Sequence, residues 1–198
     1  MAGAKLSGKF ILASASPRRM ELLRLMGLTF DSITSHVDET FFEGEDPKGH
    51  VLRLSAEKAR SVSQSHPAAW VMGADTIVVI KGEVLGKPRT AEEARGMLSK
   101  LSGQRHTVFT GFTIIKKNED ILESGVADSS VLFRTIEEDE MAWYVASEEP
   151  YDKAGGYAVQ GMGAFFIRNI QGSYTNVMGL PLCEVVDVLK QIGALTFS

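Results

Sequence analysis

The sequence SASPRR at residues 14–19 combines several groups that a phosphate-binding site needs. The apolar run Phe10–Ala13 before it predicts a short buried strand, and the residues after it repeat with helical spacing as far as Gly27. Ser16 suits the position that caps a helix, and Pro17 suits the first helical position. We therefore expect a strand that leads directly into a helix N-terminus.

Arg18 and Arg19 then fall in the first turn of that helix, beside unpaired backbone N–H groups. A cation there costs about 0.3–1 kcal/mol unless an anion is present. Two guanidinium groups, the Ser14 hydroxyl and the helix N-terminus together suit a phosphate. The alternative is that both arginines point into water, and these six residues alone do not decide between the two.

Acidic residues supply the second group of candidates. Asp75 interrupts an apolar strand pattern that runs from Trp70 to Ile80. A buried carboxylate is costly unless it is paired or binds a cation, although a structural aspartate held by backbone N–H groups is the alternative. Asp38 and Glu39 form an adjacent acidic pair in a loop, a pattern that by itself indicates only a solvated loop.

Two lysines and two polar loops complete the set. Lys58 lies in a predicted helix and could face water or the sheet, with water the default; Lys87 follows a predicted hairpin. Glycine-rich polar loops occupy residues 151–161 and 172–181, but neither matches a dinucleotide-binding fingerprint. The four histidines lack the spacing of metal ligands.

Composition allows an ordinary globular enzyme. The chain has 198 residues, 44% of them hydrophobic, and a net charge of −4 without a basic run, which argues against a nucleic-acid partner. No apolar stretch is long enough to cross a membrane. The single cysteine, Cys183, indicates a reducing cytoplasm, and we expect it to be a small buried hydrophobe.

The elements that must position these residues alternate along the chain. Helices are expected from residue 17 to 27, 47 to about 65, 91 to about 102, after a capping box at 135–138 to before 150, and from 181 onward. Strands are expected at 10–13, 70–80, 83–85 after a Lys81-Gly82 turn, 107–117, 126–133 and 163–169. This alternation predicts an α/β fold with a mixed sheet and helices packed on it.

The ordered set of motifs resembles the Maf family of nucleotide pyrophosphatases over about residues 10–192. Its blocks are SASPRR at 14–19, DET at 38–40, EKA at 57–59, GADT at 73–76, KP at 87–88, DKAG at 152–155 with QG at 160–161, and GSY at 172–174 with GLPL at 179–182. Each block alone is weakly specific, whereas the ordered set is highly specific.

The resemblance implies an inosine-triphosphatase-like α/β fold: one domain over residues 1–198, with an elongated bent mixed sheet, flanking helices and two lobes around a nucleotide cleft. It also implies hydrolysis of a nucleoside triphosphate to the monophosphate and pyrophosphate, by a cytoplasmic homodimer that uses Mg²⁺ or Mn²⁺. The roles that it implies are Asp75 as proton acceptor; Lys58 and Lys87 as catalytic cations; Ser14, Arg18, Arg19, Thr76 and Gln160 in substrate binding; and Glu39, Asp75 and Asp38 as metal ligands. Since aspartate is a weak base, we expect the cation to share in activating the attacking water.

Three positions indicate which base is bound. In the branch of the family that acts on dTTP and UTP, these positions carry an arginine, a threonine and a glutamine, and Arg18, Thr76 and Gln160 match all three. The sister branch that acts on 7-methyl-GTP carries an aromatic residue, a glutamine and a glutamate. A glutamine amide can pair with both the carbonyl acceptors and the N3–H donor of a pyrimidine.

Two other functions remain open from the sequence. The enzyme could act on modified nucleotides as a house-cleaning pyrophosphatase, with dTTP and UTP as surrogates. Alternatively, the chain could be a non-catalytic, nucleotide-sensing regulator of cell division or septum formation. The presence of Asp75, Glu39 and Lys58 argues against purely regulatory use, because a binding module has no need for an acid that activates water.

Overall fold

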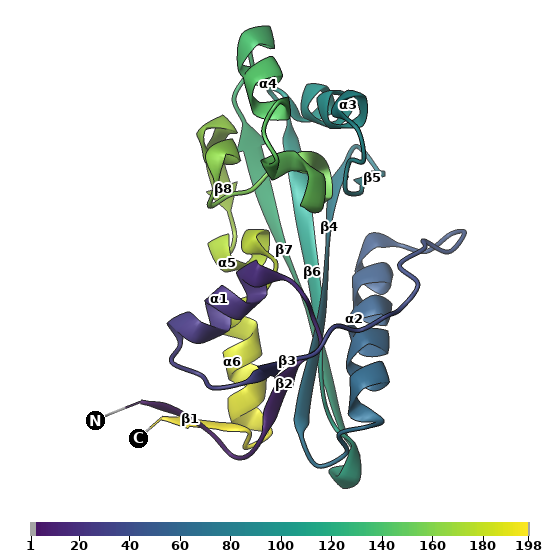
Figure 1. Cartoon of the computed structure of the whole chain (residues 1–198), viewed down its shortest axis with the longest axis vertical. Helices are drawn as coiled ribbons and strands as arrows, with labels where there is room; N and C mark the ends of the chain where they lie inside the picture. Colours follow the sequence, from purple (N-terminus) through teal and green to yellow (C-terminus); the bar gives the residue numbers. More distant parts are fainter. Residues whose placement is uncertain (1–2, 198) are drawn as a thin grey trace. The chain divides into compact units, whose positions relative to one another are not determined.

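The computed structural model describes residues 3–197 and contains a seven-stranded mixed sheet with helices packed on it (Figure 1). The strands are β1 (Ala4–Leu6), β2 (Phe10–Leu12), β3 (Asp31–Ser32), β4 (Trp70–Ile80), β5 (Glu83–Leu85), β6 (Arg105–Lys116), β7 (Ile121–Phe133), β8 (Ile167–Gln171) and β9 (Leu195–Phe197). The α-helices are α1 (Pro17–Leu25), α2 (Pro47–Ser63), α3 (Ala91–Leu101), α4 (Glu138–Val145), α5 (Tyr174–Met178) and α6 (Leu182–Gln191). The predicted α/β class with a mixed sheet is confirmed.

The large sheet has the order β3-β2-β4-β6-β7-β8, and β5 pairs with β4. Strand β2 is parallel to β3 and β4, whereas β4–β5 and β7–β8 are antiparallel. A separate antiparallel pair joins β1 to β9, near the two ends of the chain. Sequence patterns did not predict β1, β3 or β9, because these short strands have neither the continuous apolar run that marks β2 nor the hairpin turn that marks β5.

By its internal contacts the chain divides into two compact units. The first contains residues 1–75, 110–127 and 179–198, and the second contains residues 76–109 and 128–178. Strands β4, β6 and β7 each contribute residues to both units. The expectation of a single domain with two lobes around a cleft stays a prediction.

In the first unit, α2 covers one side of the strands, and α1 and α6 lie on the other side (Figure 1). Apolar residues of α2, among them Ala59 and Val62, pack against Ile11 of β2 and Val71 of β4. The expectation that Cys183 is buried is wrong. It lies on a different side of α6 from the buried Val185 and Leu189, because residues two positions apart face different directions on a helix.

In the second unit, α3 and α4 pack with a core that contains Leu98, Phe133, Tyr144 and Phe166. Helix α3 begins as predicted, with Thr90 accepting a hydrogen bond from the Glu93 backbone N–H. The predicted capping box of α4 is displaced by two residues. Its members are Glu137 and Glu140 rather than a box that begins at residue 135.

The Ile136 backbone N–H explains this displacement, because it donates to the Ser102 hydroxyl and keeps that stretch out of the helix. The last predicted strand also begins late, at Ile167, because residues 162–166 form a 3₁₀ turn. The Lys81-Gly82 turn is confirmed, with both residues at positive φ as a two-residue hairpin requires. No helix within residues 3–197 is both long and apolar enough to span a membrane.

The burial of one histidine in the second unit predicts that stability depends on pH. His106 is 2% exposed; its Nε2 lies 2.8 Å from the Tyr157 hydroxyl, and its buried Nδ1 has no hydrogen-bond partner. Burial lowers the pKa of His106 from its ordinary 6.5 to about 4. Between these pH values the unfolded chain binds a proton that the folded chain does not, so stability falls as pH falls.

We predict that lowering the pH from 7 to 5 costs the folded protein about 2 kcal/mol through His106. Urea unfolding of wild type and His106→Gln at both pH values measures this contribution, which the variant should lack. The exposed His36→Gln serves as the control and should retain the wild-type dependence. An equal pH dependence in wild type and His106→Gln would show that His106 does not cause it.

Candidate active site

Helix α2 comes unusually close to strand β4 at Gly73. A Cβ atom on this residue would overlap the Ser55 carbonyl oxygen and lie 2.7 Å from the Ala59 backbone nitrogen. Only glycine therefore permits this separation of helix and strand. The approach brings Lys58, which precedes Ala59, next to the residues that follow Gly73 in the strand.

Lys58 lies between two carboxylates. Its Nζ is 2.7 Å from Asp75 Oδ1 and 2.6 Å from Glu39 Oε1. The side chains of Lys58 and Asp75 are only 8% and 9% exposed, whereas that of Glu39 is 50% exposed. The expectation that Lys58 faces water is wrong, because the close approach at Gly73 turns it toward the strand. Removing one partner of a buried ion pair costs about 3–5 kcal/mol, since the remaining charge stays buried.

The predicted phosphate segment is also folded against this unit. Ser16 occupies the N-cap position of α1 and Pro17 the first turn, as predicted, but the Ser16 side chain makes no capping hydrogen bond. The Ser14 hydroxyl instead accepts hydrogen bonds from the Ser16 backbone N–H and from Arg19 Nη1, both at 3.2 Å. Ser14 is thus an acceptor already oriented at the helix N-terminus.

Arg19 is buried, so the alternative that both arginines point into water is wrong for this residue. Its Nε donates to the Gly179 carbonyl oxygen at 2.7 Å, which connects α1 to the loop before α6. Burial lowers the pKa of Arg19, and the negative charges of Asp75 and Glu39 act in the opposite direction. Arg18, its neighbour, is partly buried.

The first unit therefore gathers most of the predicted residues. Ser14 contacts Arg19, Arg19 interacts electrostatically with Asp75 and Glu39, and both carboxylates pair with Lys58. Cations, carboxylates and a hydroxyl that are distant in the sequence are thus assembled in one place. Such an arrangement can bind phosphate oxygens and accept a proton.

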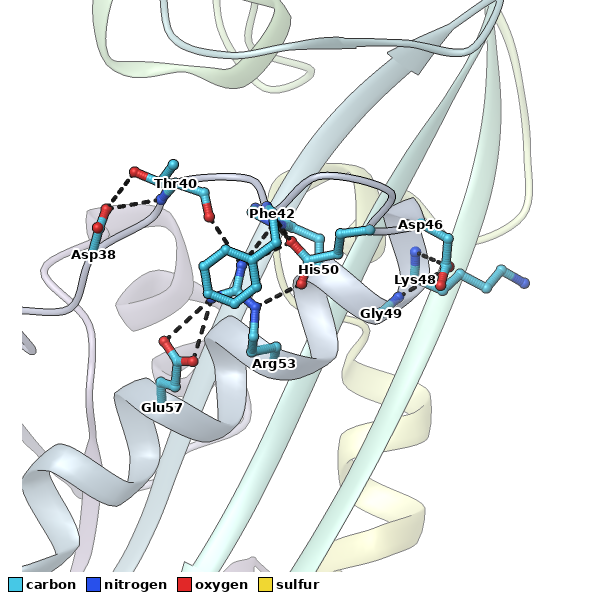
Figure 2. Close-up of polar contacts among 10 residues, drawn as sticks. Asp38, Thr40, Phe42, Asp46, Lys48, Gly49, His50, Arg53 and Glu57 are labelled. Atoms are coloured by element: carbon cyan, nitrogen blue, oxygen red, sulfur yellow. Dashed lines mark hydrogen bonds and ion pairs between the residues drawn. The ribbon is translucent and has the colours of Figure 1, made fainter.

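Asp38 has a different environment. Its Oδ1 accepts hydrogen bonds from the backbone N–H and the hydroxyl of Thr40, at 3.0 and 2.6 Å (Figure 2). These bonds lower the pKa of Asp38. Residues 3–197 hold no group of three or more His, Cys, Asp or Glu side chains that could bind a metal ion. The role of Asp38 as a third metal ligand stays a prediction.

Arg53 of α2 fastens the loop that carries Asp38 and Glu39 (Figure 2). Its guanidinium donates to both oxygens of Glu45, at 2.6 and 2.8 Å, and to the Thr40 carbonyl oxygen at 3.0 Å. The Phe42 ring covers the guanidinium at 3.8 Å, and Glu57 lies one helical turn away. We call Arg53, Glu45, Phe42 and Thr40 the loop latch.

Two further contacts support the loop latch. The Phe41 ring stacks on His50 of α2 with ring centroids 3.4 Å apart, and His50 Nδ1 lies 2.8 Å from Glu45 Oε2. The hydrogen bonds from Arg53, aided by that from His50, lower the pKa of Glu45 to about 2. Glu45 is therefore ionised throughout the physiological pH range.

The remaining predicted residues belong to the second unit. Thr76 follows Asp75 in β4 and is partly buried, whereas Lys87 and Gln160 are exposed. The Gly155 backbone N–H donates to the Gly86 carbonyl oxygen at 2.9 Å, so the Lys87 segment and the DKAG segment lie together. Gln160 lies two residues before the 3₁₀ turn at 162–166, which Gly161 precedes.

Sequence reasoning missed the loop latch and the reason for Gly73. The spacing of Arg53 and Glu57, four residues apart on one helix, indicates an ion pair, but nothing local links Arg53 to Glu45 or Thr40. The need for glycine at position 73 comes from the backbone of α2, which approaches only in the folded chain.

A family model described as Maf-like protein matches residues 9–192. The chain belongs to the Maf family.

Its curated relatives include three proteins named dTTP/UTP pyrophosphatase. The protein from Syntrophus aciditrophicus is 62% identical, over 98% of this chain and 94% of its own length. Those from Myxococcus xanthus and Geotalea uraniireducens are 48% and 46% identical; they cover 92% and 93% of this chain, and 92% and 95% of their own lengths. Among solved structures, the Ham1 protein of Staphylococcus aureus is similar with a TM-score of 0.46 and 13% identity, over 64% of this chain and 72% of that one.

We predict that Arg53→Ala releases the loop that carries Glu39. Amide hydrogen exchange of residues 38–45 should become faster, and the free energy of unfolding should fall by about 1–3 kcal/mol, as is usual when a network of charged hydrogen bonds is broken. Hydrogen-exchange mass spectrometry measures the first effect. Arg60→Ala, an exposed arginine of the same helix, is the matched control. Unchanged exchange in Arg53→Ala would show that the loop is held by other contacts.

Proposed function

We propose that this chain hydrolyses dTTP and UTP to the nucleoside monophosphate and pyrophosphate. The observation that carries the proposal is the buried Lys58–Asp75 pair with Glu39 against the same ammonium. A module that only binds nucleotide has no use for a buried acid whose cost must be offset by a buried lysine. The names of the relatives support the choice of substrates.

In the proposed reaction, water attacks the α-phosphorus and the bond to the bridging oxygen of the β-phosphate breaks, which releases pyrophosphate. Asp75 accepts the proton that the water loses. Lys58 orients the Asp75 carboxylate through their 2.7 Å contact and balances the negative charge beside it. Because the pair is almost fully buried, competing solvent is excluded from this carboxylate.

The triphosphate needs positive charge along its length. In this proposal Arg18, Arg19 and the Ser14 hydroxyl bind phosphate oxygens at the start of α1, where backbone N–H groups add to the attraction. Lys87 balances the charge that develops on the departing pyrophosphate. Arg19 is already held by Gly179 and Ser14, so little of its side-chain freedom is lost when substrate binds.

The site offers two converging carboxylates to a divalent cation, and Mg²⁺ that is bound together with substrate phosphates usually takes only one or two. Glu39 and Asp75 each direct an oxygen at one cationic nitrogen, and carboxylate oxygens are the ligands that Mg²⁺ and Mn²⁺ prefer. Glu39 and Asp75 would hold the ion, with Asp38 as the predicted third ligand. When bound, such an ion supplies positive charge against the phosphate oxygens. The cytoplasmic location and the homodimer stay predictions from the family resemblance.

The first test is a panel of dTTP, UTP, CTP, ATP and GTP with Mg²⁺ or Mn²⁺, in which monophosphate and pyrophosphate are measured. We predict selective turnover of dTTP and UTP, and a fall in kcat of about 10²–10⁴-fold in Asp75→Asn, the usual effect of losing a general base. Asp187→Asn removes an exposed carboxylate of the first unit and serves as the control.

Two results would contradict this function. Release of inorganic phosphate instead of pyrophosphate would place the cleavage at the wrong bond. Near-normal turnover by a folded Asp75→Asn protein would show that Asp75 is structural and that another group accepts the proton.

The second test concerns the base. Suppose that Gln160 pairs with the pyrimidine through its neutral amide. In Gln160→Glu a carboxylate oxygen would then face a pyrimidine carbonyl oxygen, and two opposed acceptors weaken binding by about 1–3 kcal/mol. We predict a loss of roughly 5- to 150-fold in kcat/KM for UTP and dTTP, with a smaller effect on GTP and 7-methyl-GTP. Gln171→Glu, an exposed glutamine of β8 in the same unit, is the control. An equal loss of kcat/KM on every nucleotide would show that Gln160 does not distinguish between bases.

A further inference from the structure

Glu149 holds the backbone of the segment that follows Gln160. Its Oε2 accepts a hydrogen bond from the Met162 N–H at 2.7 Å, and its Oε1 accepts one from the Gly163 N–H at 2.8 Å. The Tyr144 hydroxyl donates to Oε1 as well, at 2.9 Å. Three donors converge on one carboxylate, an arrangement that suits an ionised group because it can only accept.

Two glycines complete this arrangement. A Cβ atom on Gly161 would overlap the Glu149 carboxylate, and one on Gly163 would lie 2.9 Å from the Tyr144 hydroxyl. The two glycines of this Gly-x-Gly segment therefore leave the space that the side chains of Glu149 and Tyr144 occupy. We call these four residues the glutamate clamp.

The glutamate clamp is itself firmly supported. Tyr144 is fully buried on α4 and packs edge-on against Phe166 with ring centroids 5.0 Å apart. On the other side of Gln160, the residues Tyr157 to Val159 are buried, and Tyr157 is hydrogen-bonded to His106. Gln160 is thus an exposed residue between two fixed stretches of backbone.

We propose that Glu149 is a positioning residue that determines base preference by holding Gln160 in place, without touching the substrate. This inference rests on the proposed function, in which Gln160 pairs with the pyrimidine. An amide that must match both an acceptor and a donor discriminates only if its backbone is fixed. Without the clamp, the segment would have to be ordered during binding, and the pyrimidine would lose its advantage over other bases.

Glu149→Gln tests the inference with little change in size. The new amide keeps one acceptor oxygen, but its NH₂ group faces a backbone N–H donor. We expect the ratio of kcat/KM for UTP to that for GTP to fall at least roughly fivefold, the effect of about 1 kcal/mol, mainly through a higher KM for UTP. Glu148→Gln, which neutralises the exposed neighbouring carboxylate, should keep the wild-type ratio.

A double-mutant cycle separates positioning from a general structural effect. In a Gln160→Ala background, Glu149→Gln should change the UTP-to-GTP ratio no further, because the residue through which it acts is absent. If Glu149→Gln folds poorly, Gly161→Ala disturbs the same contact from the backbone side. As a single substitution it should lower the ratio of kcat/KM for UTP to that for GTP.

The outcomes separate this inference from the proposed function. A wild-type enzyme without preference for UTP and dTTP overturns the proposed function, and this inference with it. If wild type prefers UTP and Gln160→Ala removes that preference, a folded Glu149→Gln with the wild-type ratio overturns this inference alone. The same holds if Glu149→Gln lowers the ratio equally in the Gln160→Ala background.

Discussion

The contact between α2 and β4 at Gly73 is the constraint on which the rest of the site depends. Where the helix backbone meets the strand with no side chain between them, Lys58 lies beside Asp75 and both are buried. A buried ion pair adds little net stability, because the loss of hydration offsets much of the attraction between the charges. The packing of α2 against β4 must therefore stabilise the fold enough to keep this pair buried.

Two different supports hold polar residues at this enzyme's candidate site. Glu39 reaches Lys58 from an exposed loop, and that loop is fastened to α2 through Arg53 and Glu45. Arg19 is held by Gly179 and Ser14 instead, in the interior of the first unit. The loop is thus tied by charged hydrogen bonds near the surface, whereas Arg19 is fixed by burial. We expect the loop to be the part that moves more easily.

In the second unit, a segment is likewise held by hydrogen bonds to a charged side chain, here the carboxylate of Glu149. Glu149 satisfies two backbone N–H groups and a tyrosine hydroxyl, and its proximity explains a glycine that would otherwise have no evident purpose. In both units, a glycine lies where a segment that carries a predicted site residue packs closely against another part of the chain. A side chain at position 73 would therefore push the α2 backbone away, and one at position 161 would displace the Glu149 carboxylate.

The sequence by itself determined most of the longer helices and strands, the starts of α2 and α3, the Lys81-Gly82 turn and the family, because these depend on local propensity or on ordered motifs. Only the tertiary structure decided that Lys58 is buried, that Arg19 is held inside, that Cys183 is exposed and that α4 begins two residues late. Each of these depends on a partner distant in sequence or on the face that a helix presents to the core. Helical spacing shows which residues share a face, but the orientation of that face is set by the packing of elements that are far apart in the chain.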